Sequence, residues 1–160
     1  MNALNPYDVF LGGRPVEEIL AATPGEIRAI LAKMSPERLS AAPAPGKWSA
    51  AEIVCHLADC DVAFGFRLRQ TLAEDNHTIQ PFDQEKWAPV YAGIPAAEAL
   101  AALTALRAWN LRLIRTALPA AANKTVTHPE RGAMTFKTIV ETIAGHDLNH
   151  LAQLKKIAAS

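Results

Sequence analysis

Residues on one helical face repeat along the last part of the chain, at positions 136, 139, 143, 146, 150, 154 and 157. Steps of three and four residues bring such positions onto one side of an α-helix. This spacing predicts an amphipathic helix that begins near Thr135, which is a suitable N-cap. Two positions of the otherwise apolar stripe are histidines, His146 and His150. Any fold of this chain therefore has to place two imidazoles against its interior.

Two further segments show helical spacing and are bounded by proline. The earlier one follows Thr23–Pro24, which we interpret as an N-cap and the first helical position, and it runs to about Met34. The later one opens at Pro95 and runs to about Leu118. Its apolar face is expected to consist of Leu103, Leu106, Trp109, Leu113 and Ala117.

A fourth helix is predicted from Ser49, because Ser49 and Glu52 have the spacing of a capping box. Its inward side should carry Ile53, His56, Leu57, Cys60, Phe64 and Leu68. Four amphipathic helices favour an all-α four-helix bundle. The length of 160 residues fits a single domain, residues 1–160.

The connections carry little regular structure in this interpretation. The 73–95 segment is long, polar and aromatic, and a loop of that length is more often functional than idle. Trp87 and Tyr91 within it could cover a pocket, whereas His77 is expected to be exposed. The sequence Lys-Thr-Val-Thr-His at 124–128 is too short to carry a sheet, so no strand is predicted.

Composition excludes several classes of protein. Lysine plus arginine equals aspartate plus glutamate, at 16 each, and the basic residues are dispersed, which argues against nucleic-acid binding. No apolar run reaches the roughly 18–20 residues of a membrane span, and the first 15 residues do not resemble a signal peptide. Two cysteines on one helix, Cys55 and Cys60, are interpreted as reduced thiols of a cytoplasmic protein.

The histidines are the candidate metal ligands. His146 and His150 are one turn apart on one face, and His56 lies on the apolar side of another helix. Three inward histidines suffice for a catalytic type of metal site, which keeps one position for water. Imidazole suits zinc, nickel, iron and copper alike. The alternative is that they are core histidines with ordinary hydrogen-bond partners.

Other residues near these histidines admit two interpretations each. Asp147 is not the glutamate of a zinc-protease motif and is expected to support a ligand or lie on the surface. Gln153 and His128 are candidates for contact with substrate or a bound water, against the alternatives of a polar rim residue and a solvated loop histidine. Cys60 could be a fourth soft ligand, although a packing role is favoured.

Four stretches together resemble the DinB-like, or YfiT-like, superfamily of metal-dependent enzymes. They are "APAPGKWSAAEIVCHLADCD", "RLRQTLAED", "PERGAMT" and "AGHDLNHLAQLKKI", and the likeness extends from about Leu20 to Ile157. It implies a four-helix bundle whose metal is held by one histidine of the second helix and by the HxxxH motif of the last. By motif position these residues are His56, His146 and His150.

The resemblance implies a class of chemistry rather than one reaction. Members of the superfamily include S-transferases that use low-molecular-weight thiols, an isomerase branch and proteins described as hydrolases. The expected activity is that of a thiol S-transferase or hydrolase with bound zinc or nickel, acting on a small molecule. The habit of the superfamily and the alanine-rich helices are compatible with a homodimer. The second hypothesis is a non-catalytic bundle that metal stabilises and that binds a small ligand or protein partner.

Overall fold

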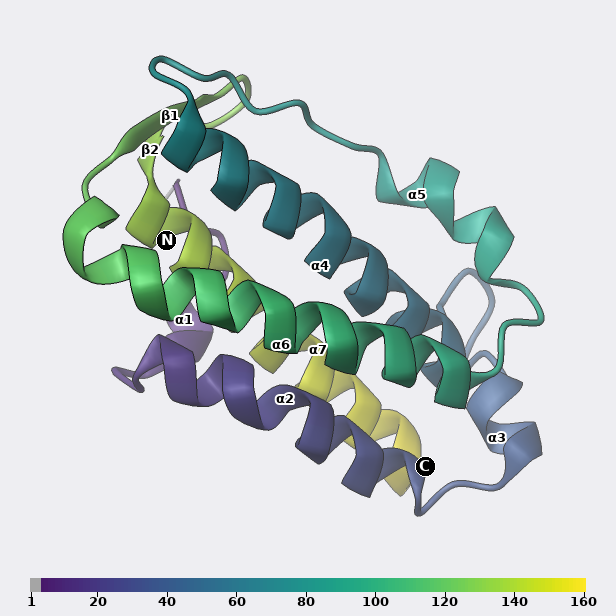
Figure 1. Cartoon of the computed structure of the whole chain (residues 1–160). Helices are drawn as coiled ribbons and strands as arrows, with labels where there is room; N and C mark the ends of the chain where they lie inside the picture. The colour runs from purple at the N-terminus through teal and green to yellow at the C-terminus, as the bar shows by residue number, and fades with distance from the viewer. Residues whose placement is uncertain (1–3) are drawn as a thin grey trace.

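The computed structural model describes residues 4–160 of the chain, so residues 1–3 of the expected domain lie outside the described residues. Its long helices are α2 (Val16–Leu31), α4 (Ala50–Ala73), α6 (Ala96–Ala121) and α7 (Phe136–Ala159). Figure 1 shows these four helices side by side, which confirms the expected all-α bundle. None of the helices described is long and apolar enough to cross a membrane.

Short elements occupy the connections. They are α1 (Asp8–Leu11), α3 (Pro36–Ser40), α5 (Gln84–Trp87) and the 3₁₀ helix η1 (Ala88–Tyr91). The 73–95 segment is therefore partly helical rather than an irregular loop throughout.

A small β-hairpin precedes α7 and corrects the expectation that the chain forms no strand. Strand β1 (Thr125–His128) pairs antiparallel with β2 (Gly132–Thr135). The hairpin gains a third neighbour, because Thr127 exchanges backbone hydrogen bonds with His77 and Ile79 of the long connection. Four residues are enough for a strand here because both partners lie on the bundle, with Val126 and Met134 buried.

The first long helix begins earlier than predicted. Helix α2 starts at Val16, and Thr23 lies inside it, where its hydroxyl donates to the Ile19 carbonyl instead of capping a helix. Pro24 also lies inside, although proline has no N–H for the Leu20 carbonyl four residues earlier. That carbonyl accepts instead from Arg107 at 3.1 Å. A distant arginine thus compensates for the interruption, which local sequence rules could not anticipate.

The buried face of α6 also differs from the prediction. Trp109 was expected inside but is 62% exposed. The buried residues of α6 are instead Ala96, Ala99, Leu100, Leu103, Arg107, Asn110, Leu111 and Ile114. Of the predicted face, Leu103 is buried and Leu106, Leu113 and Ala117 are half-buried, so only Trp109 was misplaced. Two of the buried residues, Arg107 and Asn110, are polar, and a search for apolar residues alone could not select them.

The predicted inward stripes of α4 and α7 are confirmed. Every apolar residue assigned to the α7 stripe is buried, and on α4 only Phe64 is half-buried. The core forms two groups of apolar side chains, one around Leu57 and Leu154 and the other around Phe136 and Ile139. The three histidines and a cluster of charged side chains are buried in the same bundle.

Candidate metal centre

Three buried histidines from two helices meet at one point. His56 of α4 and His146 and His150 of α7 are 1%, 5% and 6% exposed. The Nε2 atom of His146 lies 3.1 Å from Nε2 of His56 and 3.1 Å from Nε2 of His150. One nitrogen from each ring lies within 4.8 Å of the other two. The predicted ligand trio is therefore assembled in space.

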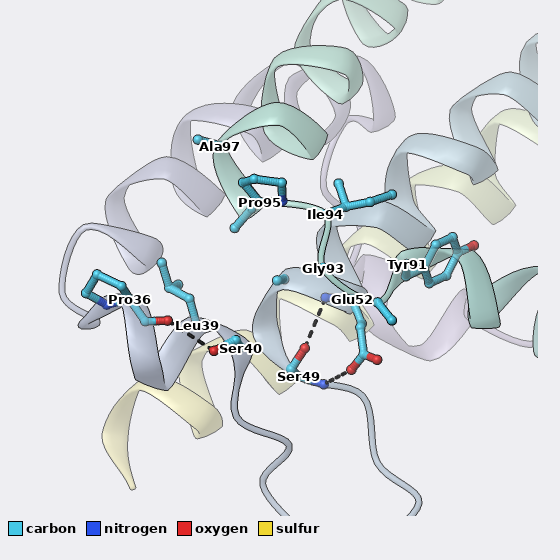
Figure 2. Close-up of a pocket in the computed structure, with 13 residues that line it drawn as sticks. Pro36, Leu39, Ser40, Ser49, Glu52, Tyr91, Gly93, Ile94, Pro95 and Ala97 are labelled. Atoms are coloured by element: carbon cyan, nitrogen blue, oxygen red, sulfur yellow. Dashed lines mark hydrogen bonds between the residues drawn. The ribbon is translucent and has the colours of Figure 1, made fainter.

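The beginning of each helix determines which residues face inward. Helix α4 starts at a complete capping box, in which Ser49 accepts from the Glu52 amide and Glu52 accepts from the Ser49 amide. Figure 2 shows both hydrogen bonds. About two turns later the same helix presents His56. Helix α7 starts at Thr135, whose hydroxyl accepts from the Thr138 amide, as predicted.

Burial keeps all three imidazoles neutral at physiological pH. It lowers the pKa of His56 to about 3, with His150 contributing further. It lowers the pKa of His150 to about 4, partly opposed by the hydrogen bond with Gln153. The pKa of His146 falls well below its usual value because of burial first and then the neighbouring His150 and His56. Neutral imidazoles carry the lone pairs that a metal ion needs.

Gln153 determines which nitrogen of His150 carries the proton. Its Oε1 atom lies 3.1 Å from Nδ1 of His150. An amide oxygen can only accept, so Nδ1 donates and Nε2 of the neutral ring presents its lone pair to the other two histidines. Outer hydrogen bonds of this kind orient histidine ligands in metal sites. Gln153 therefore orients the candidate ligand His150 in this structure, rather than only forming part of a polar rim.

The cluster fits a divalent metal ion. Ligand nitrogens of a tetrahedral zinc site with Zn–N bonds of about 2.0–2.1 Å lie roughly 3.3 Å apart, close to the 3.1 Å observed for both pairs. Within residues 4–160, the group of convergent ligand atoms consists of these three histidines. A set of three protein ligands leaves a coordination position open, which is typical of catalytic rather than structural zinc sites.

Cys60 lies beside the cluster but outside that ligand group. Its Sγ atom is 3.5 Å from Nε2 and 3.8 Å from Nδ1 of His56. Burial raises the pKa of the Cys60 thiol, and Asp147 and Asp61 raise it further. A thiol that stays protonated and packs along an imidazole ring matches the favoured packing role.

A cleft of about 720 Å³ leads to the histidine cluster, and His150 forms part of its wall. Tyr7 and Trp48 also line it, and Gln153 lies at the same wall. The ring centroid of Trp48 is 4.7 Å from that of His56, and the Tyr7 centroid is 5.1 Å from that of His146 in an edge-on arrangement. Aromatic side chains therefore stand next to two of the three histidines. We call this hollow the histidine cleft.

Tyr7 was missed by the sequence analysis because its approach depends on a glycine far along the chain. A Cβ atom at Gly145 would lie 2.5 Å from the backbone oxygen of Tyr7. Only glycine at this position lets the N-terminal segment lie directly on α7. Trp48, just before α4, packs against the core, and its contact with His56 was not anticipated either.

A second hollow, of about 490 Å³, lies between α3, the start of α4 and the segment before α6. Figure 2 shows its wall, with Leu39, Tyr91 and Ile94 around the α4 capping box. None of the three histidines lines it. Of the two hollows, only the histidine cleft has one of the three histidines, His150, in its wall.

The remaining candidates lie elsewhere. His128 is in β1 and is buried rather than solvated, and its Nδ1 accepts from the backbone amide of Glu130. His77 is also not exposed as expected, since its side chain is 11% exposed and contacts Glu74. Tyr91 is buried and donates to Asp59, whereas Trp87 is 38% exposed. Neither aromatic residue lines the histidine cleft, although Gln84 and Glu85 of the same connection do.

The charged residues beside the site are the largest omission of the sequence analysis. Asp147 is buried, and so are Asp61 and Arg107, neither of which the sequence marked as a site residue. The Arg107 guanidinium bonds to both carboxylates. Burial raises the pKa of Asp147, partly opposed by Arg107. Buried charged groups need partners, and here the partners come from different helices. No local sequence pattern reveals such a pairing.

Comparison with known proteins agrees with this site. The sequence profile of the DinB superfamily matches residues 19–154, and the chain belongs to that superfamily. A protein of Oceanobacillus iheyensis named "putative metal-dependent hydrolase" is 29% identical over 122 residues, which cover 76% of this chain and 71% of the relative. A protein of the same name from Bacillus mycoides is 26% identical over 135 residues, covering 84% and 78% of the two chains.

A solved structure confirms the fold. YfiT from Bacillus subtilis, described as "a probable metal-dependent hydrolase with an unusual four-helix bundle topology", superposes with a TM-score of 0.83. The alignment covers 90% of this chain and 84% of YfiT at 21% sequence identity. The bundle topology is thus shared between the two proteins.

Proposed function

We propose that this protein is a metal-dependent hydrolase whose ion is held by His56, His146 and His150. The observation that carries the proposal is the convergence of three neutral imidazoles, with Nε2 atoms 3.1 Å apart in two pairs, beside an open cleft. A bound divalent ion would lower the pKa of a coordinated water or thiol and so supply a nucleophile at neutral pH. Zinc and nickel are the metals proposed for this donor set.

The chain itself orients the ligands and receives the substrate. Gln153 holds the proton of His150 on Nδ1 and leaves Nε2 free to bind. Tyr7 and Trp48 form apolar walls beside the ligands, and Lys47 and Lys156 add positive charge to the lining. A volume of about 720 Å³ suits a small-molecule substrate. His128, buried in β1 and absent from that lining, is not given a catalytic role in this proposal.

Thiol transfer is the finer alternative within the same chemistry. A low-molecular-weight thiol could take the open position in place of water, as the resemblance to the superfamily implies. The two reactions differ in one requirement, because only thiol transfer consumes an electrophile in proportion to added thiol. Ester or amide hydrolysis without thiol would support the hydrolase, and turnover only with thiol would support the S-transferase.

A non-catalytic bundle stabilised by metal is the competing class. Structural zinc sites are usually closed by four protein ligands, and the ligand group in the described part of the chain has three. The adjoining cleft gives the fourth position a route to solution. Both observations support an enzyme.

The decisive experiment compares protein purified without an affinity tag with two histidine variants. We expect about one zinc or nickel ion per chain in the wild type, almost none in His150→Ala, and an unchanged content in His77→Ala, whose histidine lies outside the cluster. Hydrolysis of a panel of small esters and amides should follow the metal content. A wild-type protein that neither contains nor takes up metal would refute the proposal.

The homodimer and the cytoplasmic location are further proposals. Helices α4 and α6 pack against each other. Together they expose three large apolar side chains, Val62, Phe66 and Trp109, which suggest a face for a second copy of the chain. Sedimentation of the purified chain tests this assembly. Cys55 and Cys60 are both free thiols, which suits a reducing compartment.

A further inference from the structure

A buried arginine joins the two helices that carry the metal ligands. Arg107 of α6 is 3% exposed, and its partners Asp61 and Asp147 are 2% and 1% exposed. Nε and Nη2 of Arg107 donate to Asp61 at 3.0 and 2.7 Å. Nη2 also donates to Asp147 at 3.1 Å, and Nη1 forms a second, shorter contact with the same carboxylate. We call these three residues the arginine clamp.

The clamp uses the whole guanidinium group. Nη1 has a further acceptor in the Leu20 carbonyl of α2, the group left without its helical donor by Pro24. Asn110, one turn along α6, donates to both the backbone and the side chain of Asp61. A planar fork of five N–H donors with fixed acceptors on three helices allows little rotation or sliding.

The positions of the two aspartates relate the clamp to the metal ligands. Asp61 is on α4 and Asp147 is on α7, directly after His146. Among the described residues, the only direct hydrogen-bonding contact between side chains of α4 and α7 is the His56–His146 pair itself. The relative position of these helices is therefore set by packing and by Arg107, which bonds to both.

We propose that Arg107 is a positioning residue of the metal centre: by holding Asp61 and Asp147, it fixes the register of α4 against α7 and brings His56 to His146 and His150 before metal arrives. This inference rests on the proposed metal site. Metal ligands must be held to within about half an ångström, whereas neighbouring residues along a helix are displaced by about 1.5 Å. A slide of α7 by less than one residue would therefore separate the nitrogens.

If Arg107 acted on the metal site only through its positive charge, its removal would change metal affinity in the opposite direction from the one that positioning predicts. Arg107 lies close enough to His146 to contribute to its lowered pKa, so its positive charge opposes a cation at the site. If charge dominated, removing Arg107 would tighten metal binding, and removing the charge of Asp61 would weaken it. Positioning requires both changes to weaken binding, because each releases the same pair of helices.

The test measures Co²⁺ and Zn²⁺ dissociation constants of the full chain by competition with a chelator, together with the visible Co²⁺ spectrum. The variants are Asp61→Asn, which keeps the side-chain shape, and Arg107→Gln. Leu103→Ala is the matched control, because Leu103 is fully buried one turn earlier on α6 but is not part of the clamp. All measurements are made at a temperature where each variant is folded by circular dichroism.

We expect both clamp variants to raise the Kd by about tenfold to a hundredfold and to weaken the tetrahedral Co²⁺ absorption. Leu103→Ala should lower the unfolding midpoint but leave Kd and spectrum unchanged. Wild-type affinity in Asp61→Asn, or tighter binding in Arg107→Gln, would overturn the inference while leaving the metal site intact. A wild type that binds neither ion would overturn the proposed function itself. If Arg107→Gln does not fold, Arg107→Lys replaces it, because lysine keeps the positive charge but lacks the planar fork of donors. Positioning then predicts weaker metal binding, and wild-type affinity would overturn the inference.

Discussion

Two polar clusters are buried in this bundle, and they differ in the source of their positive charge. In the arginine clamp the chain supplies the cation, since the Arg107 guanidinium bonds to both carboxylates. In the histidine cluster three neutral imidazoles direct nitrogen atoms at one point, and we propose that a divalent cation from solution binds there. The first cluster is complete when the chain folds, whereas the second is the proposed metal-binding site. Breaking the clamp should therefore cost folding stability even without metal, whereas breaking the histidine cluster should chiefly cost metal binding.

The largest loss of folding stability is expected from breaking the arginine clamp. Arg107→Met would leave Asp61 and Asp147 buried without a counter-charge. Removing one partner of a buried ion pair typically costs about 3–5 kcal/mol. Urea denaturation of the metal-free protein should show a loss in that range, whereas a loss below about 1 kcal/mol would mean that the clamp is not a closed ionic unit.

Bound zinc should stabilise the protein only through the histidine cluster. Zinc at a hundred times its Kd is expected to add about 2.7 kcal/mol to the unfolding free energy of the wild type. His146→Ala should show no such gain, and neither should His150→Ala. Thermal unfolding with and without zinc measures this difference. An equal gain in wild type and variants would place the bound metal elsewhere on the chain.

A smaller effect is expected from the residue that orients a ligand. Gln153→Leu removes the acceptor for Nδ1 of His150, and we expect metal affinity to fall about tenfold. Asn149→Leu is the control, because Asn149 lines the same cleft and has no hydrogen bond to a histidine within the described residues. Isothermal titration with zinc measures both. If the two variants behave alike, the Gln153 contact has no special role.

The smallest signal should be the proton count on metal binding. Three ordinary histidines with a pKa near 6.5 would release about 2.7 protons at about pH 5.5. Burial holds the pKa of His56 at about 3 and that of His150 at about 4, with His146 also well lowered. His56 and His150 are therefore already neutral above about pH 5, and the lowered pKa of His146 favours its neutral form as well, so fewer than one proton should leave. Calorimetry in buffers of different ionisation heat gives the count, and a release near three would contradict burial of the cluster before binding.

The sequence predicted the histidine cluster better than the clamp, for a physical reason. His146 and His150 interrupt one apolar stripe at a one-turn spacing, and His56 lies within another, so each helix carries its own evidence. The three residues of the clamp lie on three helices, and none has a local sign of burial. Arg107 and Asp61 resemble surface charges until the helices are packed. Only the folded structure shows that Arg107 also donates to the Leu20 carbonyl of α2, which has no helical donor because residue 24 is proline.

The same limit applies to the fold. Periodicity located the four long helices, but it placed the start of α2 at Thr23 because Thr-Pro is a common helix opening. It also selected Trp109 for the buried face of α6, where Arg107 and Asn110 lie instead. In both places tertiary hydrogen bonds outweighed a valid local preference. The contact of Tyr7 with the site similarly depends on Gly145, far along the chain.

The proposal that most needs testing is that the histidine cluster binds a divalent metal ion taken up from solution. Native mass spectrometry of untagged protein, with elemental analysis of the same sample, tests it most directly. The account predicts one divalent ion per folded chain in the wild type and none in His150→Ala, with both proteins folded. Equal metal content in the two proteins, or a wild type that stays metal-free after incubation with zinc and nickel, would contradict it.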